Sequence, residues 1–219
     1  MRPLTSPAAG RTLQAVGVGY VLCWVVGLVL GGPDLLPDAD AAQIRDATAA
    51  SPTVTIFAVL VHGVAAVLLV ALGARLPPSG RRAASLLLAS AAAVLSLVQL
   101  TGELVLVSAT ESIDPVTVWT TITVADGTKM LVLAAWIAVV HGWRPRGTAA
   151  PALAPLFVAL SGATVLALVV SGAGYLTRSP GLMTAAYVSL PLLLVWVLAA
   201  TQIRSRPDVE ISQAVPSSV

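Results

Sequence analysis

The sequence predicts an all-α, polytopic integral membrane protein built as a six-transmembrane helix bundle. The chain has 219 residues, of which 57% are hydrophobic and only 10% are charged. Soluble domains carry about 25% charged residues, so this composition is typical of a membrane protein. Six apolar segments are long enough to cross about 30 Å of hydrocarbon at roughly 1.5 Å per residue, and no connector is long enough for a second domain.

The six predicted spans are approximately 12–31, 52–74, 83–108, 115–141, 153–174 and 181–203. Together they form one domain over 1–206, followed by a flexible tail over 207–219. Three spans begin at a capping residue followed by proline: Ser51-Pro52, Asp114-Pro115 and Ser179-Pro180. Ser and Asp side chains accept hydrogen bonds from the free N–H groups of a first turn, and proline at the first helical position loses no bond there.

Arginine is concentrated in alternate connectors, and this predicts the orientation of the bundle. One side holds Arg2, Arg11, Arg75, Arg81, Arg82, Arg144, Arg146, Arg204 and Arg206, whereas the other holds Arg45 and Arg178. By the positive-inside rule, both termini are expected in the cytoplasm, with the protein in the cell membrane. The clusters contain no interleaved aromatic residues, so we expect the lipid bilayer as a partner and no nucleic acid.

The first outer loop, from Gly32 to Ala50, is the only sizeable one. Asp38 or Asp40 is positioned to cap a short helix that runs through Ala50. Such a helix would dip into the membrane interface with Leu35, Leu36 and Ile44. Two interpretations stay open, a lid over the bundle and a solvated acidic loop.

Two ionisable residues near the middle of the span 115–141 are the starting point for a site hypothesis. They are Asp126 and Lys129, the only lysine in the chain. An ionisable group at the centre of a spanning helix costs roughly 2.5–3.5 kcal/mol on insertion scales, so it usually faces inward, is paired and has a function. One helix face carries Trp119, Thr123, Asp126 and Met130, with Lys129 at its edge.

Counting residues from the outer ends of the spans brings further polar side chains to a similar depth. His62 follows Pro52 by ten residues and Asp126 follows Pro115 by eleven, which places both about 15 Å below the boundary. Gln99 and Glu103 share a helix face in the outer half of the span 83–108. We therefore expect His62, Gln99, Glu103, Asp126 and Lys129 to converge on one buried polar pocket.

Each of these residues also has a structural interpretation. Asp126 and Lys129, at a spacing of i, i+3, can neutralise each other as an internal ion pair. Glu103 can extend to the outer surface, and His62 can hydrogen-bond to a neighbouring helix. Tryptophan is typical of membrane interfaces, which fits Trp119. Trp24, Trp136 and Trp196 have no clear assignment from sequence and are compatible with partly facing the interior.

Several enzyme classes lack their motifs in this chain. There is no G-x-G-x-x-G, G-x-x-x-x-G-K-[ST], H-E-x-x-H or G-x-S-x-G, so nothing supports nucleotide binding, zinc proteolysis or the usual serine hydrolase elbow. The lone Cys23 excludes an internal disulfide and a cysteine metal cluster. We expect neither a cofactor nor a metal.

The bias toward Ala, Val, Leu and Arg, with one lysine and no asparagine, is typical of a bacterium with a GC-rich genome. In size, helix number and buried carboxyl groups, the chain resembles the small bacterial membrane-bound terpene cyclases of secondary metabolism. This resemblance implies a substrate that is a hydrophobic isoprenoid or a prenylated compound. There is no D-D-x-x-D sequence, and the nearest acidic cluster, Asp38-Ala-Asp40, departs from D-x-D-D. Proton-initiated cyclisation is therefore the compatible chemistry.

Such an enzyme needs an acid and a wall that stabilises a cation. A carboxyl group in an apolar cavity can protonate an alkene or epoxide, because desolvation disfavours the carboxylate anion. Asp126 or Glu103 would be the acid, and Glu103 is the better candidate if Asp126 pairs with Lys129. Aromatic faces stabilise a carbocation. The candidate walls are Trp119, Trp136, Tyr187 and Trp196, and Thr123, Lys129, His62 and Gln99 complete the expected substrate-binding set.

Two other classes remain compatible with the same residues. In a small proton-coupled transporter or membrane-embedded binding subunit, the buried acids would carry protons or hold a cationic solute. In a structural partner protein, they would only join helices. Neither an inverted repeat nor a pair of broken helices supports the transporter. The sequence leaves the oligomeric state open.

Overall fold

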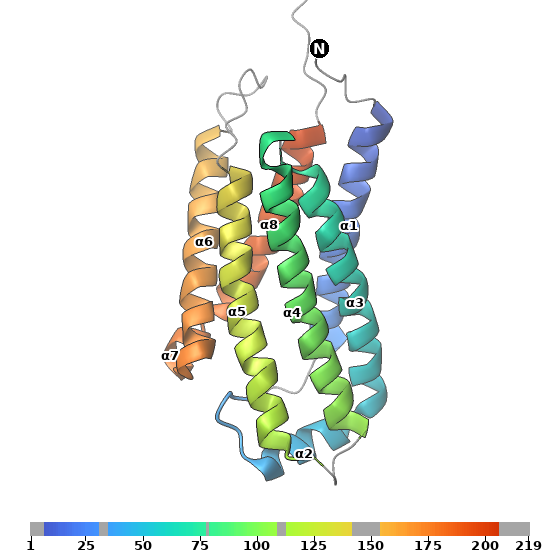
Figure 1. Ribbon diagram of the computed structural model, residues 1–219, viewed down its shortest axis with the longest axis vertical. Helices are drawn as coiled ribbons and strands as arrows, with labels where there is room; N and C mark the ends of the chain where they lie inside the picture. Colours follow the sequence, from blue (N-terminus) through green and yellow to red (C-terminus); the bar gives the residue numbers. More distant parts are fainter. Residues whose placement is uncertain (1–6, 31–34, 78, 109–112, 142–153, 206–219) are drawn as a thin grey trace, which may run out of the picture.

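The protein is described here from a computed structural model, which covers residues 7–30, 35–77, 79–108, 113–141 and 154–205. These residues form helices and short connectors, without β-strands in the described part of the chain (Figure 1). The elements are α1 (Pro7–Leu30), α2 (Ala41–Ala50), α3 (Pro52–Arg75), the 3-10 turn η1 (Ser79–Arg81), α4 (Arg82–Ser108), α5 (Pro115–His141), α6 (Ala154–Thr177), α7 (Pro180–Met183) and α8 (Ala186–Ser205). The tail expected over 207–219 lies outside the described residues.

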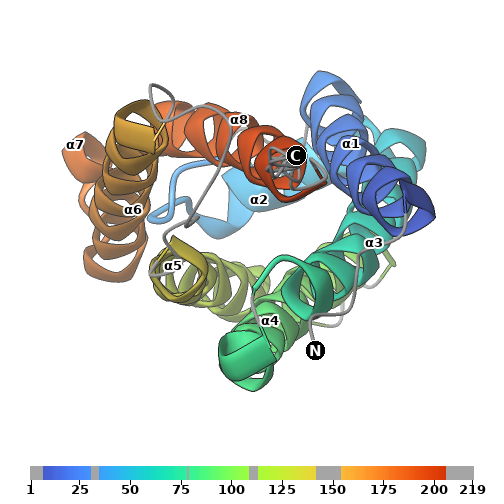
Figure 2. The ribbon, with the colours of Figure 1, turned by 90° about the horizontal axis from the view of Figure 1, so that it is seen from above.

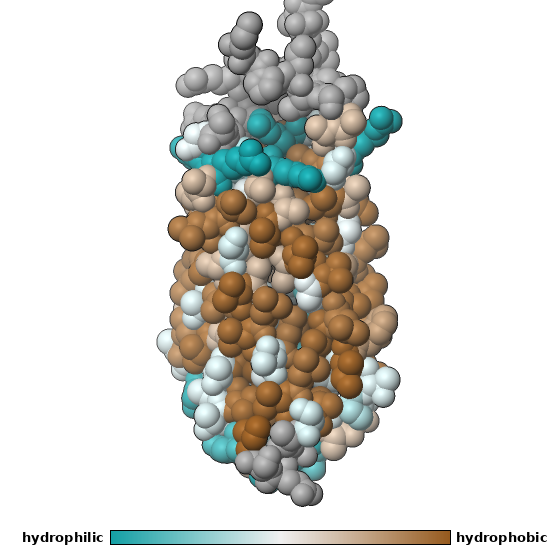
Figure 3. Space-filling model, turned by 45° about the vertical axis from the view of Figure 1, so that its right-hand side comes forward, coloured by the Kyte–Doolittle hydropathy of each residue, from teal (hydrophilic) through white to brown (hydrophobic). Residues whose placement is uncertain are grey.

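Six helical segments are long and apolar enough to cross a membrane. The last of them runs from Pro180 to Ser205 and includes α7, a two-residue break and α8. The space-filling view shows apolar side chains over the middle of the molecule and hydrophilic ones at its ends (Figure 3). This distribution is what a bilayer requires, because hydrocarbon cannot hydrogen-bond to polar groups. The protein is therefore a multi-pass membrane protein with an all-α fold, as predicted.

The six long segments form a closed ring. Seen along its axis, neighbouring helices follow the order α1, α3, α4, α5, α6 and α8, and α8 returns to α1 (Figure 2). The short helix α2 lies across one end of this ring. We call that end the α2 end, and we call the opposite end the arginine end because Arg11, Arg75, Arg81, Arg82 and Arg204 lie there.

In the half of the bundle toward the arginine end, two fully buried tryptophans connect the helices. Trp136 of α5 donates its indole N–H to Ser85 Oγ of α4 at 2.9 Å, and Ser85 in turn donates to the carbonyl oxygen of Gly73 on α3 at 2.9 Å. Trp196 of α8 donates to Ser161 Oγ of α6 at 2.9 Å. The two indole rings pack edge to face with centroids 5.4 Å apart. Close-packed rings with satisfied N–H groups make this half a dry structural core.

At the α2 end, a short helix covers the bundle. Asp40 caps α2 by accepting from the backbone N–H groups of Ala42 and Gln43, while the Gln43 side chain accepts from the backbone N–H of Asp40. This reciprocal pair is a capping box. Ile44 is fully buried in a small cluster with Ala39, Leu106 and Ile122. It therefore packs against the bundle, which corrects the prediction that it would dip into the membrane interface. The helix itself, with its Asp40 cap, is where the sequence placed it.

The three Ser/Asp-Pro boundaries are present, but only one uses its expected side chain. Each of α3, α5 and α7 begins at the proline. Asp114 accepts from the backbone N–H groups of Val116 and Thr117 and from the Thr117 hydroxyl. Ser51 and Ser179 make no capping hydrogen bond with their side chains, which corrects the prediction for these two positions. Proline alone is enough to start those helices, since it removes one donor that would need a partner.

Candidate functional site

A cavity of about 490 Å³ lies inside the ring, and all six long segments contribute to its wall. Its volume falls within the range of small-molecule pockets, roughly 300–1,000 Å³. The wall is mainly apolar, with Leu69 and Leu100 among its buried members. Polar side chains occupy a part of it on α3, α4 and α5. The expected set of His62, Gln99, Glu103, Asp126 and Lys129 does line this one cavity.

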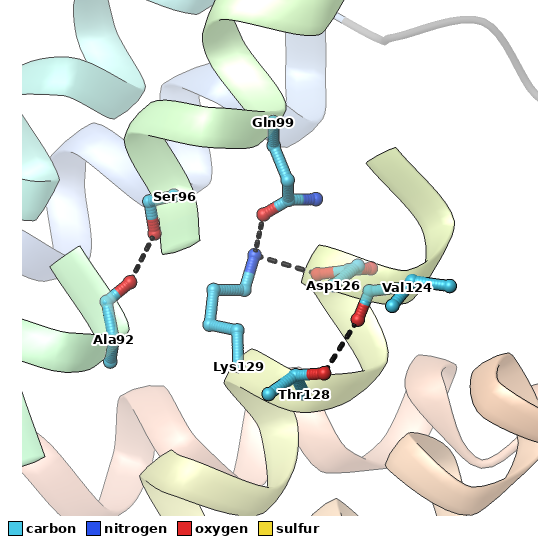
Figure 4. A network of polar contacts seen from close by, with 7 residues as sticks. All are labelled: Ala92, Ser96, Gln99, Val124, Asp126, Thr128 and Lys129. Carbon is cyan, nitrogen blue, oxygen red and sulfur yellow. Dashed lines mark hydrogen bonds and ion pairs between the residues drawn. The ribbon is translucent and has the colours of Figure 1, made fainter. Parts of the chain in front are cut away.

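An ion pair between Asp126 and Lys129 forms the centre of the polar wall (Figure 4). Lys129 Nζ lies 2.6 Å from Asp126 Oδ1, and it also donates a hydrogen bond to Gln99 Oε1 of α4. The side chain of Lys129 is 5% exposed and that of Asp126 is 16% exposed. A buried charge requires a partner of opposite sign and further hydrogen bonds, and here one carboxylate and one amide supply them. Asp126 and Lys129 therefore do form the internal ion pair of the structural interpretation, and this pair lines the cavity.

The pair joins two helices and contacts an aromatic ring. Gln99 belongs to α4, whereas Asp126 and Lys129 lie one turn apart on α5. Lys129 Nζ lies 5.5 Å from the ring centroid of Trp24 on α1, which is within the range of cation–π attraction. The ammonium group is thus held from three sides, by α1, α4 and its own helix. This arrangement fixes its position in the wall of the cavity.

Glu103 lines the same cavity from α4, one turn beyond Gln99. It is half-buried, and it makes no hydrogen bond and no ion pair with another described residue. The two carboxyl groups of the cavity therefore differ in their surroundings. Asp126 is held by a cation, whereas Glu103 is free to meet a bound molecule. Its exposed fraction does not place it at the outer surface, where the alternative interpretation put it.

An aromatic wall on α1 includes one residue that the sequence analysis did not single out, Tyr20, and one that it left without a clear assignment, Trp24. Tyr20 and Trp24 of α1 line the cavity, with ring centroids 6.5 Å apart. Trp24 also packs against the imidazole of His62 on α3 at 4.7 Å. A Cβ atom at Gly27 would lie 2.2 Å from His62 Nε2, so only glycine allows α1 to approach α3 here. The only sequence signal for a close helix contact here is the spacing of Cys23, Gly27 and Gly31 at four-residue intervals, and helix packing alone explains that pattern.

Two further tyrosines complete the aromatic lining. Tyr187, which was predicted, lines the cavity from α8, and Tyr175 lines it from α6. Four described members of the predicted site do not line the cavity: Trp119, Thr123, Trp136 and Trp196. Trp136 and Trp196 belong to the dry core because their indole N–H groups pair with serines deep in the arginine half. They are not walls of this cavity, which corrects that expectation.

Trp119 and Thr123 lie on α5 toward the α2 end. Trp119 donates its indole N–H to the carbonyl oxygen of Leu36 at 2.8 Å, so it holds the segment that leads into α2. The Thr123 hydroxyl donates back to the carbonyl oxygen of Trp119 at 2.8 Å. Both side chains share a helix face with Asp126, as predicted, but their polar atoms are engaged with backbone carbonyls. Trp119 thus attaches the cover at the α2 end, whereas the Thr123 hydroxyl bonds within its own helix.

Comparisons of the chain with protein families, with curated proteins and with solved structures give no match. Among the described residues, no group of three or more His, Cys, Asp and Glu side chains is placed to hold a metal ion. The cavity itself offers one carboxyl group without a partner among the described residues, one ammonium group held in an ion pair, one imidazole and an aromatic wall around a largely apolar space.

Proposed function

We propose that the protein is an integral membrane enzyme that cyclises a linear isoprenoid or prenylated substrate, with Glu103 as the proton donor. One observation carries this proposal. A carboxyl group without a partner shares a mainly apolar cavity with the aromatic rings of Tyr20, Trp24, Tyr175 and Tyr187. An acid to create a carbocation and aromatic faces to stabilise it are the two requirements of this chemistry.

Each step of the proposed reaction conserves atoms and charge. The Glu103 carboxyl group gives its proton to one carbon of a terminal alkene, or to an epoxide oxygen, and a carbocation forms on the adjacent carbon. A second double bond of the same chain attacks that cation and closes a ring. Loss of a proton from the cyclic cation to the Glu103 carboxylate restores the acid and leaves a neutral product. The net reaction is an isomerisation that needs no oxidant or reductant.

The surroundings of the acid favour Glu103 over Asp126. Lys129 holds Asp126 in an ion pair with Nζ 2.6 Å from Oδ1, so this carboxyl group is already engaged by a residue of the protein. Closure of the α2 end by the cluster around Ile44 and of the opposite end by the tryptophan core limits the access of water. Water would otherwise capture the carbocation before the ring closes.

The test of this function compares three variants at one position. Glu103→Gln keeps the shape of the side chain but cannot donate the proton, so we expect at least about a 100-fold loss of cyclic product with folding nearly intact. Glu103→Asp retains an acid and is expected to keep part of the activity, and Thr101→Ala on the exposed face of α4 serves as the matched control. Substrates are farnesyl- and geranylgeranyl-type compounds, and the product formed in D₂O should contain one added deuterium.

Two results would contradict this proposal. Full activity in Glu103→Gln would reject Glu103 as the proton donor. A wild-type protein that forms no cyclic product, yet dissipates a proton gradient in proteoliposomes when a solute is added, would establish the proton-coupled transporter instead.

We further propose that the protein lies in the cell membrane with both termini in the cytoplasm and the α2 end outside. The support is the excess of arginine at the opposite end. In a Cys23→Ser background, a cysteine at Asp40 should react with an impermeant thiol reagent in intact cells, whereas a cysteine at Ser79 should not. The reverse labelling pattern would invert the orientation of every helix.

A further inference from the structure

The cavity reaches the side of the bundle between α1 and α8. Three residues of its wall are exposed: Leu28 of α1 at 52%, Tyr187 of α8 at 76%, and Pro191 one turn further along α8. The wall residues from α3, α4 and α5 are buried or half-buried. The exposed rim is therefore formed by two helices only. We call this rim, defined by Leu28, Tyr187 and Pro191, the lateral opening.

The course of α8 explains why the opening exists. Near the arginine end α8 contacts α1, where Gln14 Nε2 donates to Gln202 Oε1 at 3.0 Å and a Cβ atom at Gly17 would lie 2.7 Å from Thr201. From there α8 runs obliquely toward α7, which packs on α6 (Figures 1 and 2). The two helices therefore diverge toward the α2 end. Leu28 and Tyr187 lie in that diverging part.

Both ends of the ring are closed by packing. Toward the arginine end, Leu72, Trp136 and Ile137 are fully buried in the main core. At the α2 end, the cluster around Ile44 seats α2 on α4 and α5. Among the described residues, exposed side chains of the cavity wall occur only at the lateral opening. This makes the side of the bundle the approach to the cavity.

The position of the opening defines the physical class of molecule that can use it. Leu28, Tyr187 and Pro191 all belong to segments that cross the membrane, so the opening faces the bilayer. A water-soluble solute does not dissolve there, whereas a lipid chain does. The polar wall, with Lys129, Gln99 and Glu103, belongs to α4 and α5 and not to the two helices of the rim. A molecule that fills the cavity thus combines an apolar chain with a group that meets this polar wall.

We propose that the cavity takes its ligand from the bilayer through the lateral opening, and that this ligand is an isoprenoid lipid with a linear chain. The proposal rests on the function proposed above for the choice of an isoprenoid, and it adds the route of entry and the bilayer as the source. The reactive part of the chain reaches Glu103, while the remainder extends along the α1 and α8 side toward the opening.

The test closes the opening in the folded protein. In a Cys23→Ser background, cysteines replace Leu28 and Tyr187, and a flexible bis-maleimide then bridges them in proteoliposomes. The probe is geranylgeraniol carrying a photoactivatable diazirine, and mass spectrometry measures the label on peptides of the inner wall that contain Met130 and Leu133. The unbridged protein that carries Leu28→Cys and Tyr187→Cys in the Cys23→Ser background is the reference for labelling, because Tyr187 itself lines the cavity. After bridging, we expect labelling of the inner wall to fall at least tenfold.

The matched control bridges the same two helices where they already touch. Gln14→Cys and Gln202→Cys, treated in the same way, should leave labelling of the inner wall unchanged because the lateral opening stays free. Unchanged labelling after the Leu28 to Tyr187 bridge would overturn the lateral route. Stronger labelling of the inner wall by diazirine-tagged palmitic acid than by the isoprenoid would overturn the ligand class.

The outcomes for entry and for catalysis are separable. If wild-type protein labels its inner wall but forms no cyclic product, the cyclase fails and the lateral route stands. If the bridged protein still forms cyclic product at the wild-type rate, the lateral route fails and the cyclase stands.

Discussion

The two halves of the bundle bury polar groups in different ways. In the arginine half, Trp136 and Trp196 each donate a hydrogen bond to a serine hydroxyl. Each of these serines in turn donates to a backbone carbonyl oxygen, that of Gly73 or that of Phe157. In the α2 half, an ion pair, an unpaired carboxyl group and an imidazole surround a cavity. The first arrangement satisfies each donor within a close-packed core, and the second leaves space beside its ionisable groups.

The difference separates structural polar groups from candidate functional ones. A buried indole or hydroxyl that is hydrogen-bonded contributes roughly 1 kcal/mol and fixes helix contacts. An ionisable group in a membrane is far more costly, so it persists where it does chemistry or holds a ligand. The presence of a polar residue in a span is therefore a weak indicator of a functional site. An ionisable residue that lines a cavity is a stronger indicator.

The largest expected effect tests whether the ion pair holds the cavity half together. Asp126→Ala leaves the Lys129 ammonium buried without its carboxylate, and we expect it to lower the free energy of unfolding by about 3–5 kcal/mol. Asp126→Leu combined with Lys129→Met should recover much of that loss. Unfolding of the four variants of a double-mutant cycle in detergent measures the coupling. A coupling energy of zero would show that the ion pair does not stabilise the cavity half.

A second prediction compares two glycines of α3 that lie in different halves. A Cβ atom at Gly73, in the arginine half, would lie 2.4 Å from the Cβ of Ala89, whereas one at Gly63 meets nothing closer than Leu100 Cδ1 at 3.9 Å. Gly73→Ala should lower the free energy of unfolding by about 1–3 kcal/mol because it forces α3 from α4. Gly63→Ala should not lower it and should raise it by up to about 1 kcal/mol, because the methyl group fits and alanine favours a helix more than glycine does. Equal changes in the free energy of unfolding for the two variants would mean that α3 is packed equally closely at both positions.

The smallest effect concerns the end of α5 next to α2. The hydrogen bond from the Thr117 hydroxyl, followed by those from backbone N–H groups, lowers the pKa of Asp114 below its ordinary value. A lowered pKa stabilises the folded first turn above the ordinary pKa of about 4, and this contribution is lost as the pH falls through the lowered value. The protection factors of the Val116 and Thr117 amides, which are measured against their intrinsic exchange rates, should therefore fall as the pH drops from about 4 through the lowered pKa. Thr117→Val should raise the pKa and shift the onset to higher pH, and an unchanged onset would contradict this.

Much of the architecture was predictable because hydropathy and helix starts are local properties of the sequence. Pro52 and Pro115 mark the first residues of α3 and α5, and counting from them placed His62 and Asp126 at one depth. Tyr20 was missed and Trp24 was left unassigned because α1 carries no Asp, Glu, Lys, Arg or His residue in its apolar part that would indicate an inner face. Rotation of a uniformly apolar helix is set by its neighbours, and no periodicity in its own sequence reveals it.

Trp136 and Trp196 were wrongly predicted to line the cavity for a similar reason, because their surroundings are set by other helices. Trp136 and Trp196 are large, apolar and aromatic, which suits a cavity wall and a core equally well. The choice depends on Ser85 and Ser161, whose hydroxyls lie within hydrogen-bonding distance of the indole N–H groups across helix boundaries. These pairs are separated by 51 and 35 residues, so only the assembled bundle brings them together.

The single lysine gives the molecule a built-in chemical reporter. Lys129 carries the only side-chain amine in the chain, and it is 4% exposed in the folded bundle. A water-soluble acylating reagent does not dissolve in the bilayer that the lateral opening faces, so it should leave Lys129 of the native bundle unmodified. Modification of Lys129 by such a reagent records that the bundle has opened at its centre. Its rate under native conditions thus measures how often α1, α4 and α5 separate around the cavity, without any added label.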